Sequence, residues 1–418
     1  MASITNVIFY ALIFLSVYVQ VFFFVTFLEN RKKIFTRNKK IKLNFYPAVT
    51  IAVPCFNEEK TVYRTVRSLL NLNYPKNKVK IFLIDDGSID GTWNIIKRFE
   101  KYPNIRIFHQ ENGGKYTALN LALKHIETDF FGGLDADSLA DPESLVRLMS
   151  YFEKNPSIMA VTPSVNVHNP KNILQNAQRA EYQMGLYLKK MLGFLGAINV
   201  TPGPMTIFRK KVFADLGYYR PGHNTEDMEI AYRMQKNYYK IENCNDAYVY
   251  TNTPTTIKKL YKQRLRWIYG FINNTFDYKS VLFRKKYGNF SIFTLPMGLI
   301  SIVSASYLFG RIIYSLGYFL YLKIMVLRIV GFHFNININN LVSNFDPFFI
   351  NTQSFLFLII FVYFFVIFSM IFGRKMAEGK WAFSFDMFYF FPVFSLIAPF
   401  WLLKAIYNTI LSKKPAWR

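Results

Sequence analysis

The sequence predicts an α/β protein with a mainly parallel sheet, joined to helices that cross a membrane or lie along its surface. Three observations support this class. Strand-like and helix-like segments alternate at intervals of roughly 25–30 residues in the middle of the chain, as in sheets built from βα units. Long uncharged apolar stretches occur only near the two ends. Hydrophobic residues make up 52% of the 418 residues, 44 of them Phe, and the net charge is +25, which is typical of a membrane protein with a basic cytoplasmic face.

The first apolar stretch predicts a retained membrane anchor at residues 1–30. Residues 1–28 carry no charge, and 7–28 form a continuous run of 22 residues, long enough to cross a bilayer at about 1.5 Å per residue. A cleaved signal peptide is the alternative, but it would begin with positive charge and have a shorter apolar core. The next stretch, 31–42, has seven cations and no acid, so we expect a basic cytoplasmic linker (31–45) and an N-terminus outside.

The C-terminal part of the chain, 286–412, predicts a second membrane region, followed by a short tail at 413–418. With the N-terminal anchor, about four membrane segments are expected, since apolar runs cover 289 to about 330, 355–373 and 381–403.

The charges between these runs predict their topology. Segment 332–346 has no Lys or Arg and is expected outside, whereas the basic segment 373–380 is expected inside. The last apolar run contains Asp386, Pro392 and Pro399, so it either crosses or turns back as a hairpin broken at the prolines.

Residues 46–285 are expected to form the α/β domain. The elements should follow in the order strand 48–56, helix 58–71, strand 79–87, helix 92–100, strand 104–110, helix 115–126, strand 129–137 and helix 141–154. The last of these helices should begin with Asp141 as its N-cap and Pro142 in its first turn. In such a sheet, ligands bind beyond the carboxyl ends of the strands, so the residues that follow each strand are the candidates for a site.

Acidic residues follow two of these strands. Asp85 and Asp86 end the second strand, and Asp135 and Asp137 end the fourth. An aspartate after a strand often only shapes a turn or caps a helix, and this interpretation is kept for Asp90. The sequence "DADS" presents two carboxylates one residue apart, which suits Mg²⁺ or Mn²⁺ together with phosphate oxygens.

The segment "HQENGGKYTALN", residues 109–120, predicts an anion site. Gly113 and Gly114 allow close backbone approach, and Lys115 begins a helix, where backbone amides and a cation both favour an anion. The chain has no Walker A sequence and no G-x-G-x-x-G after its first strand, which argues against ATPase and dinucleotide-binding classes.

Two further classes are disfavoured by composition. The only cysteines are Cys55 and Cys244, without a CxxC motif, so neither a disulfide framework nor a structural zinc site is expected. The excess cations flank the apolar runs, where anionic lipid is a simpler partner than nucleic acid. We therefore expect a lipid bilayer as partner and no nucleic acid.

Seven short motifs carry a resemblance to a known family. They are "PCFNEE" (54–59), "DDGSIDGT" (85–92), "ENGGKYTALN" (111–120), "DADS" (135–138), "TPGPMTIFR" (201–209), "NTEDMEIAYRM" (224–234) and "QRLRW" (263–267). In this order they resemble the processive family-2 glycosyltransferases, the membrane synthases of hyaluronan, poly-N-acetylglucosamine, chitin and cellulose, and the bacterial poly-N-acetylglucosamine synthases most of all. The resemblance implies a GT-A fold with a mixed, mainly parallel sheet, a catalytic domain on the cytoplasmic side of a multi-pass plasma-membrane protein, and interfacial helices at about 173–197 and 255–273.

The resemblance also implies a role for individual residues. The donor would be a UDP-sugar, UDP-GlcNAc or a related hexose, held by Pro54, Asn57, Glu58, Asp85, Asp86, Lys115, Asp135, Arg264 and Arg266. A divalent ion, Mg²⁺ or Mn²⁺, would be bound by Asp135 and Asp137. The acceptor would contact Gly203, Glu226, Gln263 and Trp267.

Asp227 corresponds to the family's catalytic base. The acceptor hydroxyl must lose its proton as it attacks the anomeric carbon, and one base opposite the leaving group implies inversion at that carbon. The alternative is that Thr225 or Asp227 only caps the helix that follows. The period of the "QRLRW" helix suits an amphipathic helix at the membrane surface, with Leu260, Trp267 and Phe271 available to an apolar environment.

The predicted activity is metal-dependent, inverting extension of a polysaccharide, coupled to its passage through the membrane. One alternative is transfer of a single sugar to a membrane lipid. Another, from a different class, is a transport or scaffold subunit without catalysis, which the presence of Asp135, Asp137 and Asp227 argues against. An accessory membrane subunit is compatible with either activity.

Overall fold

The computed structural model describes residues 4–35, 41–331 and 354–415. The chain forms two compact units, one of Phe23–Met297 with Ile367–Arg418 and the other of Met1–Phe22 with Gly298–Val366. The predicted external segment 332–346, part of the basic linker (36–40) and the end of the tail (416–418) lie outside the described residues.

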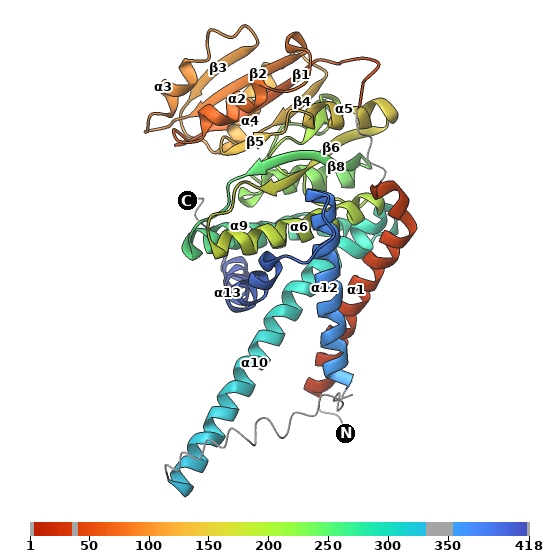
Figure 1. Ribbon diagram of the computed structural model, residues 1–418, viewed down its shortest axis with the longest axis vertical. Coiled ribbons are helices and arrows are strands. Elements are labelled where there is room, and N and C mark those ends of the chain that lie inside the picture. Colours follow the sequence, from red (N-terminus) through yellow and green to blue (C-terminus); the bar gives the residue numbers. More distant parts are fainter. Residues whose placement is uncertain (1–3, 36–40, 332–353, 416–418) are drawn as a thin grey trace. The chain divides into compact units, whose positions relative to one another are not determined.

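The larger unit is built on an eight-stranded sheet with the strand order β3-β2-β1-β4-β7-β6-β8-β5 (Figure 1). Parallel pairs join β1 to β2, β2 to β3, β1 to β4, and β6 to β8. Antiparallel pairs join β4 to β7, β6 to β7, and β5 to β8. The predicted class, a mixed and mainly parallel sheet, is therefore confirmed. The strands are β1 Val49–Cys55, β2 Val79–Asp86, β3 Ile105–Gln110, β4 Phe130–Gly133, β5 Ser138–Ala140, β6 Ile158–Val167, β7 Ile207–Arg209 and β8 Lys240–Thr251.

Apolar side chains of the central strands pack on both faces of the sheet. Ile51 and Leu83 belong to one buried cluster, whereas Ala52 and Ile84 belong to a second cluster. Successive residues of a strand point to opposite faces, so a strand covered on both sides reads as an uninterrupted apolar run. The covering helices are α2 Val62–Leu70, α3 Thr92–Lys97, α4 Lys115–Lys124, α5 Ser144–Lys154, α7 Lys211–Leu216 and α8 Glu226–Lys236.

Two helices begin later than predicted, because polar groups before them are used in turns. The Asp141 carboxylate accepts the amide of Glu143 at 3.0 Å, and α5 begins only at Ser144, so Asp141 is not its N-cap. The Glu58 carbonyl accepts the amides of Thr61 and Val62, and α2 begins at Val62 rather than at Glu58.

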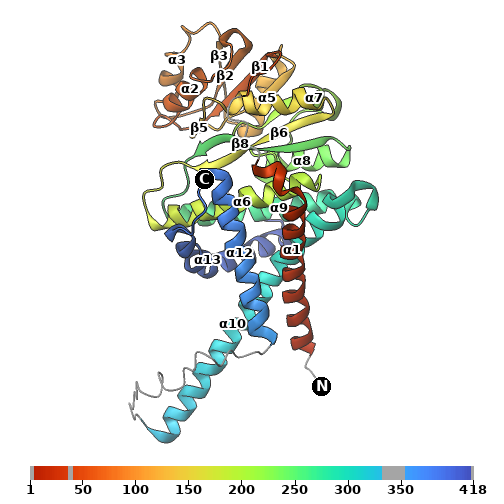
Figure 2. The same ribbon diagram turned by 45° about the vertical axis from the view of Figure 1, so that its right-hand side comes forward.

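Three long helices pack together beside the β6–β8 half of the sheet. They are α6 Ile173–Phe194, α9 Ile257–Asp277 and α13 Phe385–Ile410. α6 packs against β6 and β8, and α13 packs against both α6 and α9 (Figure 2). Leu260 and Phe271 of α9 are 0% and 9% exposed. They are buried in protein, so the prediction that they are available to an apolar membrane environment is wrong.

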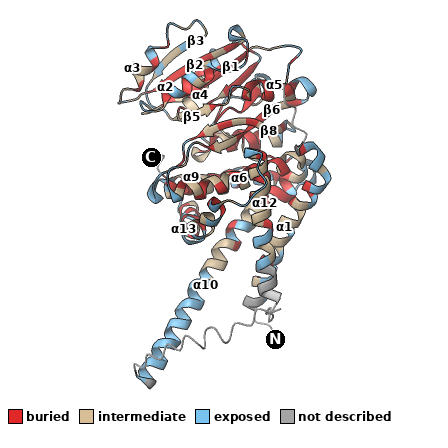
Figure 3. Cartoon of the chain, in the orientation of Figure 1, coloured by how far each residue is buried: buried red, intermediate tan, exposed pale blue. Residues whose placement is uncertain are grey.

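Four of the described helices are long and apolar enough to cross a membrane. Their candidate spans are Val7–Ile34 in α1 (Ile4–Phe35), Phe290–Ile329 in the π-helical turn η5 (Phe290–Thr294) and α10 (Leu295–Val330), Ile360–Glu378 in α12 (Ser354–Glu378), and Phe385–Ile410 in α13. Much of α10 is exposed (Figure 3), as expected of a helix that lipid surrounds. α13 runs unbroken through Pro392 and Pro399, so the hairpin, one of the two alternatives left open for this segment, is absent from this described part of the chain. These helices support a membrane protein.

Candidate active site

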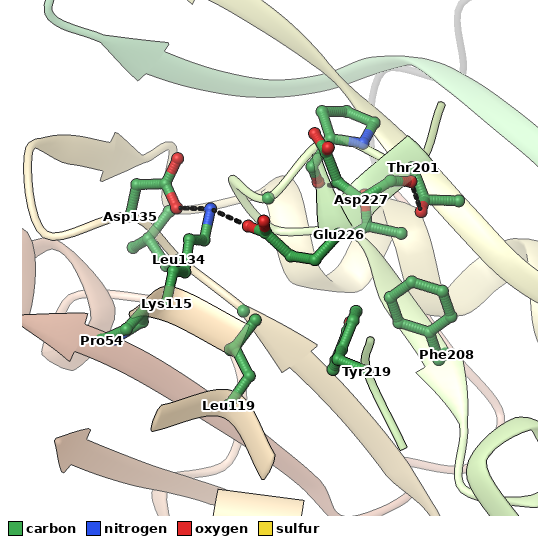
Figure 4. A pocket seen from close by; sticks show the side chains of 14 residues that line it. Pro54, Lys115, Leu119, Leu134, Asp135, Thr201, Phe208, Tyr219, Glu226 and Asp227 are labelled. Carbon is green, nitrogen blue, oxygen red and sulfur yellow. Dashed lines mark hydrogen bonds and ion pairs between the residues drawn. The ribbon is translucent and has the colours of Figure 1, made fainter. Parts of the chain in front are cut away.

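Six of the predicted site residues line a pocket at the carboxyl ends of β1 and β4 (Figure 4). These six residues come from five separate parts of the chain. They are Pro54 from β1, Lys115 from α4, Asp135 from the β4–β5 loop, Gly203 from the segment before β7, and Glu226 and Asp227 from α8. The topology makes this possible, because parallel β1 and β4 end at the same edge of the sheet.

Lys115 is the central cation of the pocket. Its Nζ lies 2.5 Å from Asp135 Oδ1 and 3.7 Å from Glu226 Oε1 (Figure 4). Burial by itself lowers the pKa of Lys115, but the nearby carboxylates, Asp135 first, raise it above its usual value. The residue is therefore a permanent positive charge at the start of α4, beside the backbone amides of a helix N-terminus.

Gly203 leaves room for this ion pair. A Cβ at Gly203 would lie 2.9 Å from Asp135 Oδ1 and would overlap Lys115 Nζ. A larger residue there would displace Lys115 Nζ from its present position.

Asp135 and Asp137 follow β4 and form the second charged feature. Burial, then repulsion from Asp135 and Glu58, raises the pKa of Asp137 to about 7. A carboxylate with a raised pKa beside other acids favours a bound cation. In the described part of the chain, no group of three or more His, Cys, Asp or Glu side chains could hold a metal. A pair of carboxylates nevertheless fits Mg²⁺ or Mn²⁺, which take their remaining ligands from phosphate and water.

Asp227 is the second residue of α8 and lines the same pocket. Its backbone carbonyl accepts hydrogen bonds from the amide and Oγ1 of Thr201, at 3.1 and 2.7 Å. Burial, then the adjacent charge of Glu226, raises the pKa of Asp227 to about 6, against the opposing effect of Lys115. At neutral pH the carboxylate is ionised, yet it is basic enough to accept a proton. The Thr225 side chain makes no capping hydrogen bond to α8: its hydroxyl oxygen accepts from Asn274 Nδ2 at 2.9 Å, and the hydroxyl donates to the Gly222 carbonyl.

The two aspartates at the end of β2 point in different directions. Asp86 accepts hydrogen bonds from Gln110 Nε2 at 2.6 Å and from the amides of Gly113 and Gly114 at 3.1 and 3.0 Å, so it holds the loop before Lys115. Asp85 is 0% exposed and pairs with His109 Nδ1 at 2.8 Å. Neighbouring residues of a strand face opposite sides, and only Asp86 faces that loop.

Asn57 and Glu58 hold the neighbouring loops together. Asn57 Oδ1 accepts the amide of Ile89 at 2.9 Å, which joins the loop after β1 to the loop after β2. The Glu58 amide donates to Thr92 Oγ1 at 2.8 Å, which joins the same two regions, and Glu58 Oε2 accepts the hydroxyl of Thr61 at 2.7 Å.

The two arginines of α9 are held by different partners. Arg264 pairs with Glu181 of α6 at 2.5 Å and stacks on Trp267, with its guanidinium 4.2 Å from the ring centroid. Arg266 Nη1 donates to the Asn224 carbonyl at 3.3 Å, in the turn that leads to Asp227. Arg266 therefore lies beside the pocket, whereas Arg264 joins α9 to α6.

Sequence reasoning missed the contribution of α6. Burial raises the pKa of Glu181, while Arg264 opposes that rise. Lys189 is half-buried, and burial lowers its pKa to about 8 despite the opposing charge of Asp227. One sequence signal could have indicated a paired carboxylate on this helix: Glu181 is the only acid between 173 and 197.

This mixed sheet, with an acid-lined pocket where β1 and β4 end, is the GT-A fold of a class of glycosyltransferases. A family model described as "Glycosyltransferase like family 2" matches residues 47–270, and the chain belongs to this family. The protein is a glycosyltransferase, and the resemblance drawn from its motifs is confirmed.

Relatives with assigned names are similar over part of their length. The chain is 33% identical over 266 residues to the poly-beta-1,6-N-acetyl-D-glucosamine synthase of Staphylococcus epidermidis, covering 62% of this chain and 63% of that protein. It is 30% identical over 266 residues to the synthase of the same name from Staphylococcus aureus strain COL, covering 62% and 64%. The match thus spans slightly less than two thirds of each relative.

One solved structure shares the fold over most of the chain. It is the mannosyltransferase PcManGT from Pyrobaculum calidifontis, in complex with GDP-Man and Mn²⁺, with a TM-score of 0.52 and 16% identity. The alignment covers 88% of this chain and 99% of that one. This likeness concerns the fold alone.

Proposed function

We propose that this protein extends a polysaccharide at the membrane by inverting transfer from a UDP-sugar, UDP-GlcNAc or a related hexose. The observation that carries the proposal is the shared pocket of Lys115, Asp135 and Asp227. The relatives named poly-beta-1,6-N-acetyl-D-glucosamine synthase support a polysaccharide product.

The donor diphosphate binds beside Lys115 and Asp135. Lys115 faces negative charge that grows on the diphosphate as the glycosidic bond breaks, and such charge is stabilised by a fixed cation. Asp135 and Asp137 would hold a divalent ion, Mg²⁺ or Mn²⁺, and that ion would supply further positive charge for the leaving diphosphate. Asp86 orders the glycine loop next to Lys115, and Arg266 approaches the diphosphate from α9.

The remaining donor-site residues act on the nucleotide end. Asn57 and Glu58 stabilise the loops that surround the uridine, together with Pro54 at the end of β1. Asp85, which is completely buried, joins the end of β2 to β3 through His109 below this end of the site. Arg264 fixes Trp267 and α6.

Asp227 takes the proton from the acceptor hydroxyl. The hydroxyl oxygen then forms its bond to the anomeric carbon, the bond from that carbon to the diphosphate oxygen breaks, and UDP leaves with the electron pair. A single displacement of this kind inverts the configuration at carbon. Trp267 offers a ring face to the terminal sugar, while Gln263, Glu226 and Gly203 line its approach.

The proposed topology follows the distribution of charge. The basic residues after the first span favour a catalytic unit (46–285) on the cytoplasmic side of the plasma membrane. Processive extension, coupled to export of the polymer, is preferred to transfer of one sugar onto a lipid because of the "QRLRW" motif. An accessory membrane subunit is compatible with this topology.

The test uses the full chain, purified in detergent or nanodiscs, with a panel of radiolabelled UDP-sugars. We expect one donor to give a high-molecular-weight product that requires Mg²⁺ or Mn²⁺ and is lost on chelation. Products carrying one sugar on lipid would establish the alternative activity. The Asp227→Asn variant should bind UDP normally and make no product; near-normal synthesis by this variant would refute the assignment of the base.

A further inference from the structure

A short basic loop, residues 279–286, connects α9 to the π-helical turn η5. Its four cations, Lys279, Arg284, Lys285 and Lys286, are all exposed, and it contains no acid. The nearest acid in sequence is Asp277, whose carboxylate lies 2.8 Å from His223 Nε2. The loop therefore presents concentrated positive charge to its surroundings.

The basic loop has a defined conformation. The Arg284 amide donates to Ser291 Oγ at 2.8 Å, and Ser291 Oγ donates to the Arg284 carbonyl at 2.8 Å. Ser291 is completely buried, as is Val281 within the loop. Asn289 Nδ2 also donates to the Leu195 carbonyl at 3.1 Å, which fixes the end of the loop to the end of α6.

This conformation holds an aromatic side chain outward among the cations. Phe283 is 72% exposed and has φ of 57°, a left-handed backbone that non-glycine residues rarely adopt. Two other apolar side chains near the loop, Phe276 and Ile292, are 51% and 45% exposed. An outward aromatic ring surrounded by Lys and Arg is the composition of elements that lie in the headgroup layer of a bilayer.

The position of the loop identifies its partner. It ends four residues before Phe290, the first residue of the candidate span Phe290–Ile329. A loop at that place lies beside lipid headgroups, and the cytoplasmic leaflet carries anionic ones. We propose that the basic loop binds the phosphate headgroups of anionic phospholipids, with Phe283 inserted below them. Binding of this kind fixes the depth of the larger unit at the bilayer, and it is independent of which sugar the enzyme transfers.

The test measures lipid selectivity of the full-length protein with spin-labelled lipids. The protein is reconstituted in phosphatidylcholine, and the immobilised fraction of labelled phosphatidylglycerol is compared with that of labelled phosphatidylcholine at low and high salt. We expect a preference for phosphatidylglycerol that declines with salt and falls by at least about fivefold when Lys279, Arg284, Lys285 and Lys286 are all replaced by Gln.

A matched control removes the same charge elsewhere. Lys97, Arg98, Lys101 and Lys124 are also exposed, but they lie on or near α3 and α4, and their replacement by Gln should leave the preference unchanged. Phe283→Asn, which suits the left-handed backbone, should weaken the preference while preserving its salt dependence. The proposal is overturned if the loop variant keeps its preference for phosphatidylglycerol, or if the control variant loses as much of it. A protein partner would then be the remaining candidate for the loop.

Discussion

Replacing Gly203 with Ala tests the arrangement of the pocket with one methyl group. The new Cβ would lie 2.9 Å from Asp135 Oδ1 and would overlap Lys115 Nζ, so the ammonium group must leave its present position. The displaced atom is the end of a flexible side chain, and the backbone of Gly203 does not have a positive φ. The fold should therefore tolerate the change, with a loss of stability below about 1 kcal/mol.

The effect on donor binding should be much larger. A hydrogen bond to a charged group contributes about 1.5–3 kcal/mol, and Lys115 would lose one to the diphosphate. At about 1.4 kcal/mol per tenfold change, this corresponds to roughly 10- to 150-fold weaker UDP binding and a similar loss of kcat/KM.

The assay is UDP affinity by calorimetry, together with the transfer rate and the melting temperature of the same preparations. Gly185→Ala is the matched control, because a Cβ at Gly185 meets no atom within 4 Å. It should bind UDP normally and melt at the same temperature or slightly above. A Gly203→Ala enzyme with UDP affinity within twofold of the parent, or one whose lost affinity is matched by unfolding, would refute the reasoning.

Three further predictions concern other charged groups. The transfer rate should rise with pH through about 6 as Asp227 loses its proton. Glu226→Gln should move this acidic limb of the kcat/KM profile to lower pH, because it removes a like charge beside Asp227. An unmoved limb would contradict the assignment of Asp227 as the titrating base. Glu181→Gln should destabilise the protein by about 1–3 kcal/mol in thermal unfolding, because Arg264 stays buried without its carboxylate partner. The control Lys240→Gln, at an exposed ion pair, should change the stability little. Burial raises the pKa of Asp137 to about 7, so Mn²⁺ binding, followed by calorimetry, should weaken as pH falls through that value. Asp137→Asn should remove this pH dependence, and its persistence in the variant would exclude Asp137 as the source.

The central sheet and its functional edge were predictable from local sequence patterns. Buried apolar runs define β1, β2 and β4, and the acids at the ends of β2 and β4 mark the edge where ligands bind. The antiparallel insertions were not predictable, because β5 and β7 have three residues each and such segments carry no periodicity.

The roles of adjacent site residues depend on geometry that the motifs do not contain. Asp85 and Asp86 have the same chemistry, but the pleat of β2 buries one against His109 and aims the other at the glycine loop. Arg264 has a carboxylate partner on a helix 83 residues earlier in the chain. No local pattern reports a pairing over that separation.

The sequence left two alternatives open for α13, because proline usually ends or kinks a helix. Pro392 and Pro399 lie inside an unbroken helix whose neighbours are α6 and α9. Packing against other helices can compensate for the backbone hydrogen bond that each proline lacks.

The docking of α13 has a practical consequence for anyone producing the enzyme as a soluble fragment. Asp386 at the start of α13 neutralises Arg179 of α6, and Thr409 near its end accepts a hydrogen bond from Asn273 of α9 at 3.0 Å. A polypeptide truncated after residue 285 would retain α6 and α9 but lack the helix that covers them, leaving Arg179 without its counter-ion and apolar side chains uncovered. Such a fragment should aggregate on expression, and recombinant work on this transferase therefore needs its C-terminus.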